Sequence, residues 1–168
     1  MKKYFYILFS IISMTLCLSS YSVSAAEMQK SVISRMTMER FIDDFPSLHR
    51  DLTALGAVHV QAFEAFIQEG SAVPDIDLIR SDLMAAQKEA KVKNVLKKHK
   101  WDNNFTAVYV AIFTAYKLIV AEELISVSSD PSLAAYITKW RSTIHADDLA
   151  IVRENRSKLE SMFLSIGQ

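Results

Sequence analysis

Hydrophobic side chains recur every three to four positions along most of the chain, which is the spacing that places them on one face of an α-helix. No stretch alternates cleanly between apolar and polar residues, as a half-buried strand does. Glycine and proline, the strongest turn residues, occur only three times each in 168 residues, which leaves little room for hairpins. The pattern therefore predicts an all-α protein, a single compact bundle of five to seven helices over residues 27–168.

Local signals predict where the first helices begin and end. Thr37 is expected to cap a first helix that stops at Phe45, because proline disfavours helical backbone at the residue before it. Pro46 then begins a second helix that runs to about Glu69. Further along, two apolar stripes are out of phase with each other, which predicts a break near Gln87.

The second half of the chain contains the most apolar segment. Phe105–Val127 is apolar on nearly every side, as in the central helix of a bundle or in a membrane span. Its uncharged part ends at Tyr116, well short of the roughly 20 residues that cross a bilayer, so a buried core helix is favoured. Pro131 begins another helix, and a last helix starts at Asp147 and Asp148, whose carboxylates suit the positive end of its dipole.

The first 26 residues differ from the rest of the chain. Two lysines precede an uncharged, mostly apolar run, Tyr4–Leu18, and small side chains fit signal-peptidase cleavage after Ala25 or Ala26. The run is shorter than a comfortable transmembrane span, which disfavours an uncleaved anchor. We expect residues 1–26 to be a signal peptide that directs the chain to the periplasm, with secretion beyond the cell as an open alternative.

Cleavage of this signal peptide changes the charge and the chemistry of the chain. The one cysteine, Cys17, is removed with it, so the mature protein has no disulfide, thiolate metal site or cysteine nucleophile. Removing the two lysines as well leaves 17 basic and 19 acidic side chains, a net charge of −2. This balance disfavours nucleic acid as the main partner, because duplex binding is driven by neutralisation of phosphates.

Sequence motifs of catalysis and cofactor binding are missing. The chain has no His-x-x-x-His or Glu-x-x-His pair, no Gly-x-Ser-x-Gly elbow and no glycine-rich phosphate loop. We therefore expect a protein that is not an enzyme and has no cofactor or metal. His59 is interpreted as a core side chain, and His145 beside Asp147 as part of a helix cap rather than a cation site. Glu122 and Glu123 point about 100° apart, so one is expected to pair with a basic neighbour.

The most unusual local feature is a basic segment, Lys88–Trp101, with six lysines. One interpretation is a solvated helix face whose lysines complement the negative C-terminal end of the helix. The other is contact with an anionic partner, in which the tryptophan suits a membrane interface. The candidate contact residues are Lys93, Lys97, Lys98, Lys100 and Trp101.

The leading functional hypothesis is a periplasmic interaction module, an adaptor, inhibitor or immunity-like protein that binds an envelope protein through a helical face. Two alternatives stay open: a bundle that binds a lipid or another apolar ligand, and an envelope-surface binder that uses the basic segment. The ligand-binding alternative requires aromatic side chains around a cavity instead of in a filled core. The candidates for lining such a cavity are Phe63, Phe66, Tyr109, Phe113, Tyr116 and Trp140.

Three short motifs carry a resemblance to other proteins. They are Arg40-Phe41-Ile42 with Phe45-Pro46-Ser47-Leu48, then Val95-Leu96-Lys97-Lys98-His99-Lys100-Trp101, then Ala115-Tyr116 in the apolar segment. Together they resemble a group of small exported helical proteins of Gram-negative bacteria, over about Arg40–Ala121. The resemblance implies the compartment and the fold, and it carries over no functional residue. That group usually has glycine after the histidine, so we expect the helix end at Lys100 to differ.

Overall fold

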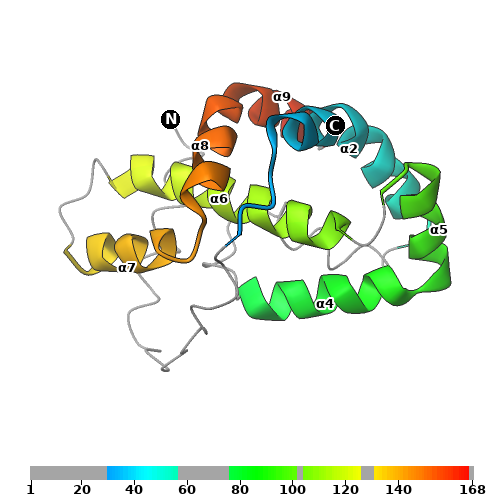
Figure 1. Ribbon diagram of the computed structural model, residues 1–168, viewed down its shortest axis with the longest axis horizontal. Coiled ribbons are helices and arrows are strands. Elements are labelled where there is room, and N and C mark those ends of the chain that lie inside the picture. The colour runs from blue at the N-terminus through cyan, green and yellow to red at the C-terminus, as the bar shows by residue number, and fades with distance from the viewer. Residues whose placement is uncertain (1–29, 57–75, 102–103, 126–130, 167–168) are drawn as a thin grey trace.

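The computed structural model describes residues 30–56, 76–101, 104–125 and 131–166 of the chain. Every regular element in these ranges is an α-helix, which confirms the prediction of an all-α bundle (Figure 1). The predicted signal peptide, His59, Phe63 and Phe66 lie outside the described residues. The helices are α2 (Arg35–Thr53), α4 (Ile76–Lys88), α5 (Ala90–Lys98), α6 (Phe105–Ile125), α7 (Pro131–Arg141), α8 (Ala146–Glu154) and α9 (Arg156–Ile166).

Helix α6 is the centre of the bundle. It runs between α4 on one side and α2, α8 and α9 on the other, with α7 beside its C-terminal half (Figure 1). The consecutive residues Val108, Tyr109 and Val110 are all at most 3% exposed, so neighbours cover more than one face of the helix. Phe105–Glu123 is the stretch of the described residues long and apolar enough to cross a membrane, yet 61% of it is buried within the protein. This burial is that of a core helix.

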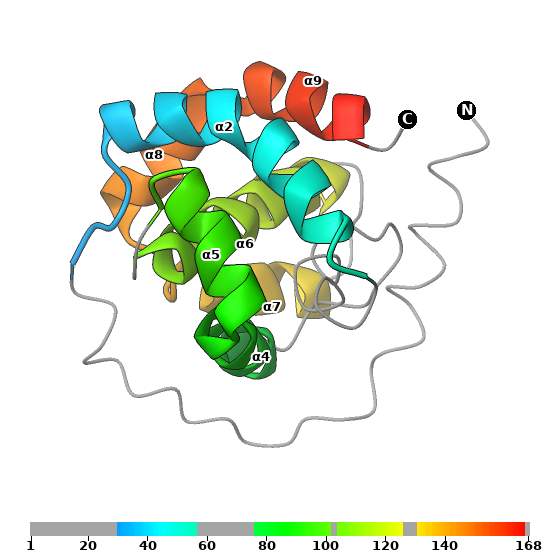
Figure 2. The same ribbon diagram turned by 90° about the vertical axis from the view of Figure 1, so that its right-hand side faces the viewer.

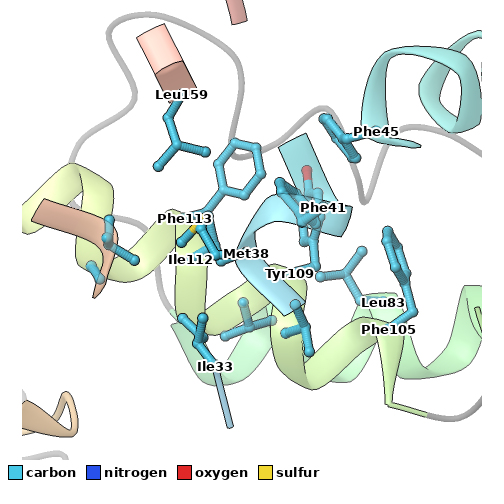
Figure 3. Close-up of a cluster of buried hydrophobic side chains, with 14 of the residues drawn as sticks. Ile33, Met38, Phe41, Phe45, Leu83, Phe105, Tyr109, Ile112, Phe113 and Leu159 are labelled. Atoms are coloured by element: carbon cyan, nitrogen blue, oxygen red, sulfur yellow. The ribbon is translucent and has the colours of Figure 1, made fainter. Parts of the chain in front are cut away.

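Aromatic side chains of α2 and α6 pack directly on one another (Figure 3). The ring centroids of Phe41 and Phe45 are 4.7 Å apart, and those of Tyr109 and Phe113 are 4.4 Å apart. A contact of 5.6 Å between the rings of Phe45 and Tyr109 joins the two helices. Two of the candidates for lining a ligand cavity, Tyr109 and Phe113, are therefore part of a filled core, the interpretation that the sequence favoured.

The cap of α2 is Ser34, and the prediction of Thr37 is wrong. Ser34 has extended backbone, and its Oγ accepts a hydrogen bond of 3.0 Å from the Thr37 N–H. Serine and threonine both cap helices well, so the two positions could not be separated by residue type. The extra turn carries no buried side chain before Met38, and the apolar pattern therefore did not reveal it.

Pro46 lies inside α2, and the predicted helix end at Phe45 is wrong. The proline ring removes one backbone hydrogen bond and crowds the preceding turn, at a cost of about 3 kcal/mol. Continuing the helix buries Leu48 and Leu52 completely. Each such side chain stabilises the fold by roughly 1.5–3 kcal/mol, which together offsets the proline. The helix therefore bends instead of ending (Figure 2).

The C-terminal end of α2 comes earlier than predicted. The helix ends at Thr53 and does not continue to Glu69, and the backbone turns at Ala54 and Leu55. Gly56 then adopts a φ of +103°, a conformation that side chains with a Cβ rarely take. The sequence predicted a longer helix because apolar residues continue beyond Gly56 at helical spacing.

Two other predicted boundaries are confirmed. The break between α4 and α5 lies at Glu89, two residues from the predicted Gln87. Leu83 before it and Val92 after it are both fully buried, so the break brings two apolar stripes onto one core. Pro131 is the first residue of α7, where its missing N–H costs no helical hydrogen bond.

The predicted last helix consists of two helices, α8 and α9, joined at Asn155. The backbone N–H of Asn155 reaches the Ile151 and Val152 carbonyls at 3.2 Å each, and its side-chain amide donates to Ile151 at 2.9 Å. Asparagine competes in this way with the helical backbone pattern and ends α8. The junction lets α9 pack against α2, while the predicted core residues Leu149 and Leu159 are buried.

Asp148 has a larger role than the predicted one of complementing the dipole of α8. It is 3% exposed and accepts hydrogen bonds from Ser31 Oγ at 2.7 Å, the Val32 N–H at 3.2 Å and the Ile33 N–H at 2.9 Å. These bonds fasten the segment before α2 to the start of α8. The carboxylate thereby supplies the acceptor that backbone groups require when they are buried outside a helix.

We expect D148A to lower the free energy of unfolding by about 2–3 kcal/mol, because it leaves buried N–H groups without an acceptor. D148N keeps one acceptor oxygen and is expected to lose less. Urea unfolding of the three proteins measures the difference. A D148A protein within about 0.5 kcal/mol of the wild type would contradict this role.

Candidate functional site

The predicted basic segment covers the solvent side of α5, at one end of the molecule (Figures 1 and 2). Val92 and Leu96 are buried and attach the other side of this helix to the core. The lysines occupy positions that point away from it and are exposed. This set is named the lysine face, and it consists of Lys91, Lys93, Lys97, Lys98 and Lys100.

Two rows of lysines run along α5. Lys93 and Lys97 are four residues apart, which places them about 40° apart around the helix and about 6 Å apart along it. Lys91 and Lys98 are seven residues apart and lie within about 20° of each other around the helix. The exposed Asn94 lies between the rows. Four ammonium groups are therefore distributed over one half of the helix surface.

Most of the lysines of this face form no ion pair within the described residues. Lys98 Nζ donates to Asp51 Oδ2 of α2 at 2.7 Å. In the described part of the chain, no ion pair involves Lys91, Lys93 or Lys97. Their positive charge is therefore concentrated in a single exposed patch.

Trp101 does not belong to this surface, and its predicted place at a membrane interface is wrong. It is 2% exposed, and its ring lies 5.5 Å from that of Phe105 in the core. The Arg40 guanidinium stacks over the same ring at 4.0 Å from its centroid, a favourable cation–π contact. The backbone N–H of Trp101 bonds to the Leu96 carbonyl at 2.8 Å, which turns the chain back toward the core.

Lys100 adopts the left-handed backbone conformation that ends α5. Its φ is +58°, and its N–H bonds to the Lys97 carbonyl at 2.9 Å while the next N–H reaches back to Leu96. This pair of bonds is a Schellman motif, in which glycine is usual because an L side chain is disfavoured there. The helix end therefore has the geometry typical of glycine although residue 100 is lysine. Whether it differs from the helix end of the resembling group stays a prediction.

Arg40 connects α2 to this helix end. Its Nη2 donates to the Lys100 carbonyl at 2.6 Å and to the His99 carbonyl at 3.2 Å, and its Nε donates to Asp44 at 3.3 Å. Carbonyls at the end of a helix have no partner within the helix, so the guanidinium satisfies them. The first two motifs that carry the resemblance to exported helical proteins are thus in contact with each other.

One polar cluster joins α2 to α5 and consists of the residue types of a catalytic triad, Ser47, His99 and Asp51, with the histidine in the middle. His99 Nε2 is 2.7 Å from Asp51 Oδ2, and His99 Nδ1 is 3.5 Å from Ser47 Oγ. The serine hydroxyl donates its hydrogen to the Asp44 carbonyl at 2.9 Å, so it is not presented to His99 as an activated nucleophile is. The sequence did not connect these residues, because α2 and α5 are far apart in the chain. In this arrangement they fasten α5 to α2.

Glu122 and Glu123 near the end of α6 are both in ion pairs. Glu122 accepts from Arg141 of α7 and from Arg153 of α8, each at 2.9 Å. Glu123 pairs with Arg156 at the start of α9. The predicted ion pairing is confirmed, and it extends to both carboxylates, which hold three helix ends to the central helix.

His145 is the N-cap of α8, which confirms the capping interpretation. Its Nδ1 accepts the Asp147 N–H at 3.2 Å. Across the described ranges, no group of three or more His, Cys, Asp and Glu side chains is arranged to hold a metal ion. The polar side chains described above either cap a helix, as His145 does, or connect two helices, as His99 and Glu122 do.

Two open hollows lie on the described surface. One lies between α2 and α9, and the other beside the N-terminal end of α2. The described aromatic residues proposed for a ligand cavity line neither of them. Trp140 is buried, and Tyr116 rests against Phe163 with 5.0 Å between ring centroids. The first hollow is lined by Ile42, Pro46, Ser157, Lys158, Ser161 and Met162, and the second by Arg35, Glu39, Glu154 and Asn155.

Comparison of the chain with known proteins finds no match. No protein-family model matches the chain. No curated protein and no solved structure matches it. The resemblance to small exported helical proteins therefore stays a prediction, and the function has to be argued from the residues of the surface.

We expect K100G to stabilise the protein by about 0.5–1 kcal/mol, because glycine adopts the left-handed conformation without strain. The matched change K97G, in the last turn of α5, is expected to destabilise by roughly the same amount. Thermal unfolding measures both, and a shift of about 1–4 °C is expected for K100G. A K100G protein as destabilised as K97G would contradict the strain assigned to Lys100.

Asp51 predicts a pH dependence of stability. Hydrogen bonds from Lys98, and then from His99, hold the pKa of this carboxyl below its usual value. A lowered pKa means that the stabilisation is present above the pKa of an unfolded aspartate, about 3.9, and is lost as the pH falls through the folded value. The difference in unfolding free energy between wild type and D51N should therefore shrink as the pH falls below about 4. In a K98M background the shrinkage should be smaller, and a difference unchanged from pH 5 to pH 2 would contradict the assignment.

Proposed function

We propose that the protein is a non-enzymatic interaction module of the bacterial periplasm, an adaptor, inhibitor or immunity-like protein. In this proposal the lysine face is the surface that binds an anionic envelope partner. The observation that carries it is the exposure of Lys91, Lys93 and Lys97 on one short helix with no ion pair among the described residues. An accumulation of one charge on an exposed surface favours encounter with a partner of opposite charge.

Charged groups elsewhere in the described chain mostly hold the fold together. Arg35 pairs with Glu154, and Arg156 pairs with Glu160 within α9. The two glutamates near the end of α6 are likewise occupied by arginines of the following helices. Single lysines elsewhere, such as Lys30 and Lys158, are also exposed without an ion pair in the described ranges. The lysine face differs from them because it gathers several such lysines on one helix, and this concentration supports a role outside the fold.

The lysine face is also well anchored. Val92 and Leu96 place one side of α5 in the core, and Arg40 and Asp51 of α2 bind its C-terminal end. A surface that is already ordered loses less conformational freedom when a partner binds. The anchoring therefore supports recognition by a fixed helical face.

The two alternatives have less support. Binding of an apolar ligand requires a cavity, and the described aromatic side chains pack on one another. Insertion into a membrane surface requires an exposed apolar side chain beside the lysines. Trp101 was the candidate for that role and is buried.

The proposal is tested by capture from envelope extract of the producing cells with three forms of the mature protein. They are the wild type, K93E/K97E, and the control K30E/K158E, which makes the same change in net charge at exposed lysines outside α5. We expect one envelope component to be retained by the wild type and the control. Its recovery should fall by at least about ten-fold with K93E/K97E, since two attractive charges become repulsive.

Two results would count against the proposed function. One is the absence of any specifically retained component at native expression levels. The other is a retained component whose recovery is the same for K93E/K97E and for K30E/K158E, because the contact would then lie outside the lysine face.

A further inference from the structure

We infer that the lysine face receives an acidic polypeptide segment whose carboxylates follow one another at intervals of about one helical turn. This inference rests on the function proposed above and names the chemistry of the partner at the same surface. It is supported by the spacing of the lysines, by the lack of large apolar side chains among them, and by the backbone conformation of Lys100.

The spacing of the lysines matches the face of a helix. Lys93 and Lys97 are about 6 Å apart along α5, the separation of glutamates four residues apart on a partner helix. Lys91 and Lys98, about 10 Å apart along the axis, flank this row across Asn94. An acidic helix laid along α5 therefore meets a cation at each of its turns, which a single small anion does not require.

A lipid surface is a poorer match for α5. Trp101, the residue best suited to a membrane interface, is buried. The predicted mature chain has a net charge of −2, so an extended anionic surface is repelled by the rest of the protein, whereas a short segment touches only the lysine face. The large apolar side chains that are exposed in the described chain all lie outside α5, and they are Val32, Met36, Met84 and Leu164.

Lys100 supplies a second, independent observation. With a φ of +58°, it is the non-glycine residue of the described chain that has a positive φ. Glycine would take this conformation without strain, so a lysine here costs stability. Strained residues of this kind tend to lie where a function uses the side chain. We assign the strain to binding, because Lys100 adds an exposed ammonium group at the C-terminal end of the lysine face.

The test measures binding of the mature protein to three probes. The first is a synthetic helical peptide with glutamate at every fourth position, and the second has the same composition with its glutamates spread around the helix. The third is a vesicle that contains anionic phospholipid. We expect the first peptide to bind at low salt, the second to bind at least about five-fold more weakly, and the vesicle not to carry the protein in flotation.

Substitutions then assign the contact to the lysine face. K93E/K97E should weaken binding of the first peptide by at least about ten-fold, and K30E/K158E should leave it within about two-fold. K100G separates binding from folding, because it should raise the melting temperature and still weaken binding by about two- to five-fold. A merely structural role of Lys100 predicts the higher melting temperature with unchanged binding.

Four outcomes would overturn the inference: no binding of the first peptide, equal affinity for the two peptides, flotation of the protein with the vesicles, or wild-type affinity in K100G. Each is distinct from a failure of the proposed function. If envelope extract yields a partner that depends on Lys93 and Lys97 while the first peptide does not bind, the interaction module stands and only the acidic helical segment is wrong. If extract yields no partner, the module itself fails.

Discussion

A helix that is apolar around most of its circumference must be covered on several sides, and this constraint organises the protein. The central helix α6 contributes buried residues on adjacent positions, such as Val108, Tyr109 and Val110. Helices α4, α7 and α8 each pack against it, and aromatic rings of α2 close the remaining side. The ion pairs of Glu122 and Glu123 then hold the later helices at its C-terminal end. Hydrophobic burial sets the arrangement, and the polar contacts fix where the helices end.

The same constraint explains why one side of α5 is exposed to solvent. This helix gives Val92 and Leu96 to the core and has nine residues in all, so its other side is left to solvent. Arg40 binds its last carbonyls, and Asp51 binds the side chains of Lys98 and His99. The lysine face is thus fixed by its own core contacts and by the neighbouring helices α2 and α4. The proposed recognition of an acidic segment is favoured by this order, because a loosely held helix would lose more conformational entropy on binding.

The sequence predicted what depends on local periodicity and missed what depends on tertiary contact. The apolar segment, the break near Gln87 and the helix start at Pro131 are local signals, and each lies close to where the structure has it. Pro46 misled because burial of Leu48 and Leu52 outweighs its local cost. Trp101 misled because only the folded chain shows that the end of α5 turns it inward. The lysine-rich segment could be recognised from composition alone. The contacts among Ser47, His99 and Asp51 could not, because these residues lie on two helices far apart in the sequence and form no motif.

Native-state hydrogen exchange of the mature protein, in buffer without detergent, tests the central claim most directly. If α6 is the covered centre of a water-soluble bundle, its amides from about Tyr109 to Ile119 exchange last, only through global unfolding. The amides of α5 and α7 exchange earlier, through local opening. The account is contradicted if the α6 amides exchange as fast as those of α5, or if they become protected only when detergent or lipid is added.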